Sequence, residues 1–264
     1  MYCLSLYNED FTKIKSLDYL PVGLGEKKFD EGWIRDNTGT HISQKNKYYG
    51  EYTFHYWFWK NVIEKIDNDT WIGFCAYRRF WSNKIDNHKI SQRGDFLRGI
   101  KDDWENYDVI LGDNIHMDGW TTMKIIKHGL KSFITNPKFF IKKNRNLRLH
   151  FNSFHGYGNL DKAIKLLEKN EREDFANFMD TRNYFNRGNM FICNSKKIIE
   201  NYYQSVFPWL ERCEKVFGFN DDNYGSTRIY GFLAERYLSY WFNKYANVIV
   251  WPIIFYDISK NDFK

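Results

Sequence analysis

Two short, mostly apolar segments bounded by polar residues constrain the fold of this sequence most. They are residues 70–77 (TWIGFCAY) and residues 107–111 (YDVIL). Apolar runs of this length without alternation are typical of strands covered on both faces, as in the middle of a parallel sheet. Further strands are expected at residues 2–7, 20–24, 184–193 and 248–255.

Helical spacing separates these strand candidates. Residues 45–67 carry aromatic and aliphatic side chains at helical intervals nearly all round, with Ser43 near the N-cap, which predicts a helix buried on several sides. Residues 160–169 form an amphipathic pattern, residues 198–217 a helical pattern with Pro208 inside, and residues 229–245 a further helix. The alternation predicts an α/β protein with a mostly parallel central sheet flanked by helices.

The composition favours one globular unit. The 264 residues are 43% hydrophobic and 20% aromatic, which excludes a disordered chain and implies a core rich in aromatic rings. No internal repeat, low-complexity tract or linker invites a division, so residues 1–264 are expected to form a single domain.

The net charge of +6 suits an acidic small molecule, an anionic membrane surface or nucleic acid. The densest basic run, residues 138–148 (KFFIKKNRNLR), is read either as a membrane-surface patch or as a solvated loop. Nucleic acid is disfavoured because no helix-turn-helix, zinc-finger or RNP signature is present.

No apolar stretch approaches the roughly 20 residues that cross a bilayer, and the N-terminus lacks a signal-peptide pattern. We therefore expect a cytoplasmic protein, with contact at the inner face of the membrane as a further option. The widely spaced cysteines, Cys3, Cys75, Cys193 and Cys213, are expected to be reduced packing residues.

A polar loop, DNTGTHISQKN at residues 36–46, leads into the aromatic helix. Free backbone N–H groups and the helix dipole at such a point favour an anion such as a diphosphate. Asp36, Asn37, Gly39 and Asn46 are the candidate donor-binding residues of this loop, with Asp36 and Asn37 able to hold a base or ribose. Ordinary capping by Asn37 or Ser43 is the alternative.

The segment GFCAYRRFW ends a predicted buried strand in Arg78 and Arg79. Ligands of parallel α/β sheets bind outside the carboxyl ends of the strands, so this pair is placed to clamp phosphates. The alternative is a structural pair that stacks on Phe80 and Trp81 or binds acidic side chains.

In RNYFNRGNMFICN, residues 182–194, Asn186, Gly188 and Asn189 interrupt an apolar strand. Glycine permits close approach of a ligand, and the amides can bond sugar hydroxyls; a simple bulge is the alternative. In residues 221–236, Glu235 and Asp222 are candidate general bases, against a structural ion pair of Glu235 or Arg236.

Metal ligation has a weak signal. Asp113 and Asp118 in LGDNIHMD are too far apart for a DxD motif, and Asp113 is either a single ligand for Mn²⁺ or Mg²⁺ or a solvated acid. The sequence has no HExxH pattern, so a zinc site is not expected.

His155, in a glycine-rich loop, is a candidate acceptor-site residue. Nucleophile elbows, a Walker loop and GxGxxG are absent, which disfavours serine hydrolases, NTPases and Rossmann dehydrogenases.

Five ordered motifs, DNTGTHISQKN, YGEYTFHYWFWKN, WIGFCAYRRFW, YFNRGNMFICN and RIYGFLAERYLSYWF, resemble a family of bacterial capsular and exopolysaccharide glycosyltransferases long catalogued as a domain of unknown function. The resemblance covers residue 20 to about residue 242. This chain differs in having Cys75 and Ala76 where the family commonly carries a His before Tyr-Arg-Arg, and Thr40 and His41 where Asp-Asn is usual.

The resemblance implies a GT-A fold, a nucleotide-sugar donor that is UDP-linked, UDP-galactofuranose included, and a polysaccharide or lipid-linked glycan acceptor. We expect Arg78 and Arg79 at the donor diphosphate, the 36–46 loop at the nucleoside, and Asn186, Gly188 and Asn189 at the sugar. Glu235 is the first candidate base and Asp222 the second, and His155 and Arg236 are assigned to the acceptor. An inactive nucleotide- or carbohydrate-binding module, or a scaffold, is the alternative.

Overall fold

A computed structural model describes residues 1–85, 95–117, 134 and 145–263. At its centre is a sheet whose strands lie in the order β10–β6–β9–β4–β1–β2–β3. The strands are β1 (Tyr2–Ser5), β2 (Leu20–Gly23), β3 (Ile34–Arg35), β4 (Ile72–Ala76), β6 (Val109–Gly112), β9 (Phe191–Cys193) and β10 (Val248–Trp251). β5 (Arg79–Trp81) pairs with β4 and with β11 (Ile253–Asp257), which also pairs with β12 (Asp262–Phe263).

The pairings of β1 with β2 and β4, of β2 with β3, and of β6 with β10 are all parallel. Within the main path of the sheet, β9 runs against both β4 and β6. The expected mostly parallel sheet flanked by helices is therefore confirmed.

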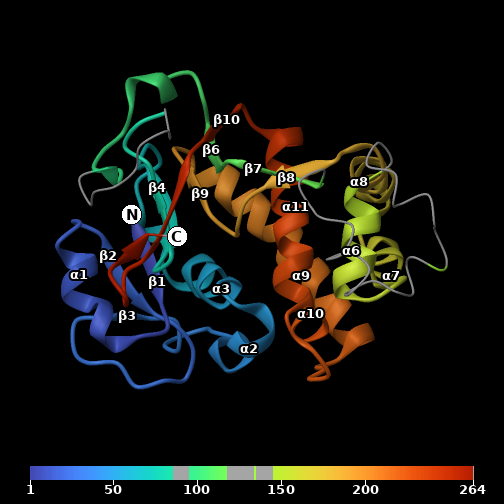
Figure 1. Ribbon diagram of the computed structural model, residues 1–264, viewed down its shortest axis with the longest axis horizontal. Coiled ribbons are helices and arrows are strands. Elements are labelled where there is room, and N and C mark those ends of the chain that lie inside the picture. The colour runs from blue at the N-terminus through green and yellow to red at the C-terminus, as the bar shows by residue number, and fades with distance from the viewer. Residues whose placement is uncertain (86–94, 118–133, 135–144, 264) are drawn as a thin grey trace.

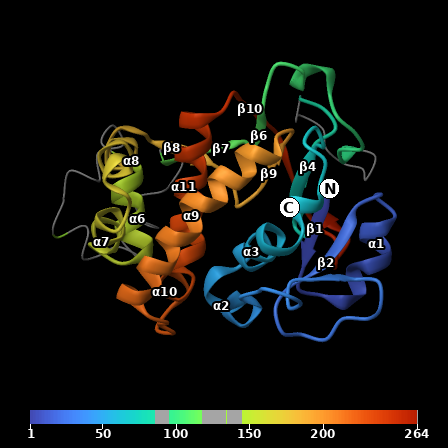
Figure 2. The ribbon, with the colours of Figure 1, turned by 180° about the vertical axis from the view of Figure 1, so that it is seen from behind.

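Helices lie on both sides of the sheet. They are α1 (Phe11–Lys15), α2 (Asn46–Tyr49), α3 (Tyr52–Asn61), α6 (Leu147–His155), α7 (Asn159–Lys165), α8 (Lys169–Thr181), α9 (Lys196–Phe217), α10 (Tyr224–Thr227) and α11 (Ile229–Tyr245). Along the long axis of the molecule, α1 lies at one end and α6–α8 at the other, with α9 and α11 between the sheet and α6–α8 (Figure 1). The reverse view in Figure 2 shows α3 beside the strands and α2 beneath it.

The aromatic helix packs as its composition predicts. Phe54, His55 and Phe58 of α3 are buried and contact Phe74 of β4, while Phe191 of β9 also contacts Phe74 and His55. Burial of large rings on this scale supplies much of the driving force for folding. The expected continuous helix at 45–67 is wrong, because Gly50, at φ +58°, separates α2 from α3.

Two expected strands are also divided. Residues 184–193 form β8 (Tyr184–Asn186) and β9, which lie in different sheets because β8 pairs with β7 (Asn114–His116). Residues 248–255 form β10 and the start of β11, with Pro252 between them.

All four cysteines are buried free thiols. In the part of the chain that the structure describes, no helix has the length and apolar character needed to span a bilayer.

Candidate functional site

The carboxyl ends of four parallel strands meet at one edge of the sheet. Following the sheet order, these ends are Gly112 of β6, Ala76 of β4, Ser5 of β1 and Gly23 of β2. Because β9 is antiparallel, the loop that precedes it, with Gly188 and Asn189, reaches the same edge. Ligands of open α/β sheets bind at such an edge.

A groove of ≈ 710 Å³ opens beyond the ends of β1 and β2. Its walls come from four parts of the chain: Leu6, the turn at residues 24–27, a segment with Ser43, Gln44, Asn46 and Lys47, and a segment with Tyr224, Thr227 and Arg228. Lys27, Lys47 and Arg228 give it positive charge, although Glu26 also lines it and Lys47 forms an ion pair with Asp221 over 2.6 Å. Pockets of this volume hold nucleotide-sized ligands.

The structure separates the roles of the two adjacent arginines. Arg78 Nε lies 3.1 Å from Oδ2 of the buried Asp257, and the Arg78 guanidinium lies over the ring of Tyr77. Arg79 is half-buried and, within the described residues, has neither a carboxylate partner nor a side-chain hydrogen bond. Its Nη1 lies 3.5 Å from the place where a Cβ on Gly188 would stand. Arg79 is therefore the guanidinium available to an anionic ligand.

The Gly188 turn is held from α11. Gly188 has φ +76°, a conformation that glycine adopts without strain, and its N–H donates to Glu235 Oε1 over 2.8 Å. Glu235 Oε2 accepts a hydrogen bond from Arg236, which is 2% exposed. The candidate base thus reaches the sugar-site loop, with both carboxylate oxygens already bonded.

The two asparagines of the same loop have different environments. Asn186 is buried, and its amide donates to Gly112 O over 3.0 Å while its oxygen accepts from Ser239 over 2.7 Å. Asn189 donates to the Gly231 carbonyl over 3.3 Å and, among the described residues, its side-chain oxygen has no partner. Of the two, Asn189 keeps an unused polar atom, whereas Asn186 ties β8 to α11.

The 36–46 loop is anchored from within. Asp36 is fully buried, accepts hydrogen bonds from the Gly25 N–H (2.8 Å) and from Thr53 Oγ1 (2.6 Å), and has a raised pKa caused by burial. The Asn46 amide donates to Thr53 Oγ1 over 3.0 Å, and Asn46 lines the groove. The structure therefore brings Asn46 to the groove and directs the Asp36 carboxylate into the protein.

Asn37 and Gly39 lie further along the same loop. Asn37 is half-buried, and Gly39 is exposed with φ +58°. A side chain at Gly39 would collide with Asn61 of α3, whose oxygen also accepts the Thr40 N–H over 3.1 Å. Neither Asn37 nor Gly39 lines the groove at residues 24–27.

Asp113 follows β6 directly. Both of its carboxylate oxygens lie 3.2 Å from Arg187 Nε, and burial raises its pKa while Arg187 opposes that rise. Asp118 lies outside the described residues. Within those residues no three His, Cys, Asp or Glu side chains gather as a metal site. Among the described residues at this edge, the Asp113 and Glu235 carboxylates are each bonded to a guanidinium, so these side chains fit Mn²⁺ or Mg²⁺ poorly.

Of the remaining predicted residues, Asp222 and His155 lie apart from this cluster, whereas Arg236 meets it through Glu235. Asp222 is exposed and bonded to Asn220 over 2.9 Å. His155 is buried, stacks on Phe232 with ring centroids 3.9 Å apart, and has a pKa lowered by burial. Arg236 lies 3.9 Å from the Phe185 ring centroid. Neither His155 nor Arg236 presents an exposed surface to an acceptor.

Only the end of the basic run at residues 138–148 can be placed, because residues 138–144 lie outside the described residues. Arg145 is buried, and Arg148 of α6 forms an ion pair with Asp180 over 2.5 Å. These two cations are therefore engaged within the protein.

Sequence reasoning missed Arg187 and Arg228. Arg187 adjoins Gly188 in a motif that was singled out, so its position was a usable signal. Arg228 is likewise the first residue of a motif that was singled out, RIYGFLAERYLSYWF, but its place at the groove comes from the packing of α11 against α2.

Comparison with known proteins adds a family and a fold. No curated protein matches this chain. A solved structure titled as the apo structure of the WbbM bifunctional glycosyltransferase is similar with a TM-score of 0.64 and 23% sequence identity. The match covers 86% of this chain and 40% of that one, so this chain spans less than half the length of that protein. The family model of a domain of unknown function, DUF4422, matches residues 6–247. This chain therefore belongs to the DUF4422 family, with the α/β fold of a glycosyltransferase.

Proposed function

We propose that this protein is a glycosyltransferase that moves a sugar from a UDP-linked donor to a glycan acceptor. The observation that carries the proposal is the unpartnered Arg79 guanidinium, among the described residues, at the edge where β4 and the Gly188 loop meet. A guanidinium without a carboxylate suits a diphosphate, which it bonds in a forked geometry.

The groove supports the placement of the nucleoside. It lies beyond β1 and β2, on the far side of β4 from the Gly188 loop in the order of the sheet, and it carries Lys27 and Arg228. A donor with its nucleoside in the groove and its diphosphate at Arg79 would bring its sugar to Gly188 and Asn189. The likeness to a bifunctional glycosyltransferase structure supports the fold on which this arrangement is built.

The chemistry we propose is a displacement at the anomeric carbon of the donor sugar. The bond to the diphosphate oxygen breaks, the acceptor oxygen forms the new bond, and a base takes the acceptor proton. Arg79 stabilises the charge that develops on the leaving diphosphate, and Glu235 is the proposed base. Polysaccharide of a capsule or exopolysaccharide is the proposed acceptor.

A second candidate is a binding module without catalysis. The specific observation in its favour is that both oxygens of Glu235 are already bonded, by the Gly188 N–H and by Arg236. In this alternative the Glu235 carboxylate shapes the loop and takes no proton.

The test is release of UDP from a panel of UDP-galactofuranose, UDP-galactose, UDP-glucose and UDP-N-acetylglucosamine, with UDP binding measured in parallel. Turnover of one donor, lost in Glu235→Gln with UDP affinity retained, supports the transferase. UDP binding with no turnover of any donor supports the binding module, and no UDP binding removes both.

A further inference from the structure

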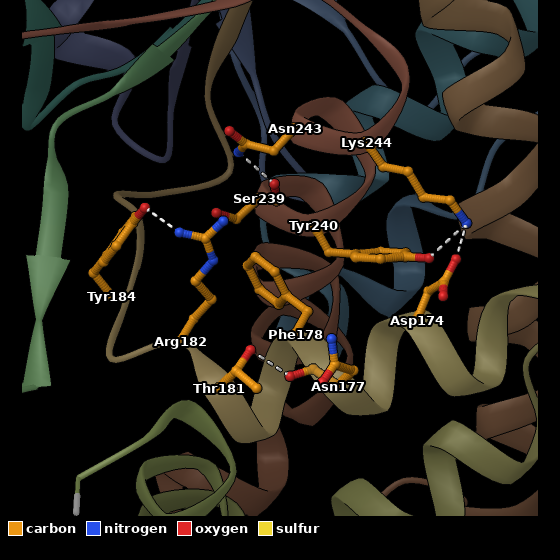
Figure 3. A pocket seen from close by; sticks show the side chains of 10 residues that line it. All are labelled: Asp174, Asn177, Phe178, Thr181, Arg182, Tyr184, Ser239, Tyr240, Asn243 and Lys244. Atoms are coloured by element: carbon orange, nitrogen blue, oxygen red, sulfur yellow. Dashed lines mark hydrogen bonds and ion pairs between the residues drawn. The ribbon is translucent and has the colours of Figure 1, made fainter.

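A second pocket, of ≈ 320 Å³, lies between α8, β8 and α11, away from the groove (Figure 3). Its volume is at the lower end of the range for small-molecule sites, about 300–1,000 Å³. The walls combine rings with hydrogen-bonding side chains. The side chains that carry the argument are Asn177, Phe178, Arg182, Tyr184, Tyr240 and Asn243.

Rings come from all three elements. Phe178 belongs to α8, Tyr184 to β8 and Tyr240 to α11, and Figure 3 shows Arg182 between Tyr184 and Phe178. Ring faces offer an apolar surface to the C–H groups of a flat ligand, and the Tyr hydroxyls add polar ends.

Several polar groups in this pocket are unused within the described residues. The Asn177 side-chain amide makes no hydrogen bond there, and Asn243 donates to Ser239 O over 2.7 Å while its own oxygen accepts nothing. Arg182 donates one bond to the Tyr184 hydroxyl over 2.7 Å and has no carboxylate partner in that part of the chain. Lys244, by contrast, is neutralised by Asp174 over 2.8 Å.

The pocket shares a helix face with the candidate site. Glu235, Ser239 and Asn243 are four residues apart along α11, so they form one stripe, with steps of about 6 Å. Glu235 meets the Gly188 turn, whereas Ser239 and Asn243 both bond to Asn186 and line the pocket. Ser239, in the middle of the stripe, is 1% exposed and bonded to the buried Asn186, so the stripe links the two sites through the protein interior.

We propose that this pocket is a carbohydrate subsite that binds one sugar unit of an oligosaccharide. Its rings cover the apolar face of the sugar, the Asn177 and Asn243 amides bond the hydroxyls, and Arg182 bonds a hydroxyl or an acidic substituent. The assignment of that oligosaccharide as the acceptor rests on the proposed function, whereas the binding itself does not.

The test is a saturation-transfer NMR titration of the protein with maltotriose and with tri-galacturonic acid, repeated with saturating UDP. Binding of at least one trisaccharide is expected. Asn177→Ala should weaken it roughly threefold to tenfold, since one or two hydrogen bonds are lost. Alanine is a better helix former than asparagine, so the variant keeps α8.

Asn201→Ala, at an exposed asparagine of α9, is the matched control and should leave the affinity unchanged. Arg182→Ala should weaken the acidic trisaccharide more than the neutral one. Binding of neither trisaccharide, or binding unchanged in both pocket variants, overturns the subsite. Trisaccharide binding without UDP binding would leave the subsite standing and refute the proposed function.

Discussion

The Gly188 N–H donates a hydrogen bond to Glu235 Oε1 over 2.8 Å, and so joins the loop before β9 to the middle of α11. The same carboxylate pairs with the buried Arg236. Glu235 therefore has a structural role, independent of any role as the base that takes a proton from the acceptor.

Glu235→Gln should destabilise the protein by about 3 kcal/mol, because it leaves a buried guanidinium without its counter-charge. Urea denaturation of the variant measures this loss. Glu173→Gln, at an exposed glutamate of α8, is the control and should change the stability little. Equal stability of Glu235→Gln and wild type would show that the ion pair is not a structural support.

His55 predicts a pH-dependent loss of stability. It is buried, with Nδ1 2.8 Å from the Tyr203 hydroxyl and Nε2 3.2 Å from the Asn189 carbonyl oxygen, and burial lowers its pKa to about 4. The unfolded chain takes up a proton near pH 6.5, where the folded protein does not. Lowering the pH from about 6.5 to 4 therefore favours unfolding.

Between about pH 6.5 and 4, the free energy of unfolding of the wild type should fall by roughly 3 kcal/mol more than that of His55→Gln, as measured by denaturation at several pH values. His116→Gln, at an exposed histidine, controls for loss of an imidazole. Parallel curves for wild type and His55→Gln would refute the assignment of this proton to His55.

Asp36→Ala should lower the free energy of unfolding by about 3 kcal/mol, because the Gly25 N–H and the Thr53 hydroxyl both lose their buried acceptor. Thermal or urea denaturation checks the value, and Asn37→Ala is the neighbouring control. If Asp36→Ala instead weakened ligand binding and left the stability unchanged, Asp36 would contact the ligand directly, as the sequence predicts.

Local patterns allowed much of the fold to be predicted. Residues 229–245 match α11 at both ends because their apolar spacing is continuous, and the buried runs at 70–77 and 107–111 became β4 and β6. Helices α6 and α8 were not expected. Yet Glu171, Phe175 and Met179 of α8 are buried at intervals of four residues, which was a readable signal.

The site was less predictable because its partners are distant in the chain. Arg78 and Arg79 are neighbours in sequence, but Asp257, near the C-terminus, pairs with Arg78. The sequence predicts Asn186 as a sugar ligand, but in the structure its side-chain oxygen accepts a hydrogen bond from Ser239, 53 residues later in the chain. A pattern identifies residue types at a strand end, whereas only tertiary packing shows which of them remain available.

The central claim is that Arg79 holds the donor diphosphate, and calorimetric titration of UDP tests it most directly. The Arg79→Ala variant should bind UDP roughly tenfold to a hundredfold more weakly than wild type, as expected for a lost charge-assisted bond. Arg98→Ala, which lines a different pocket together with Met1 and Trp71, should bind UDP normally. Equal UDP affinity in wild type and Arg79→Ala would contradict the account.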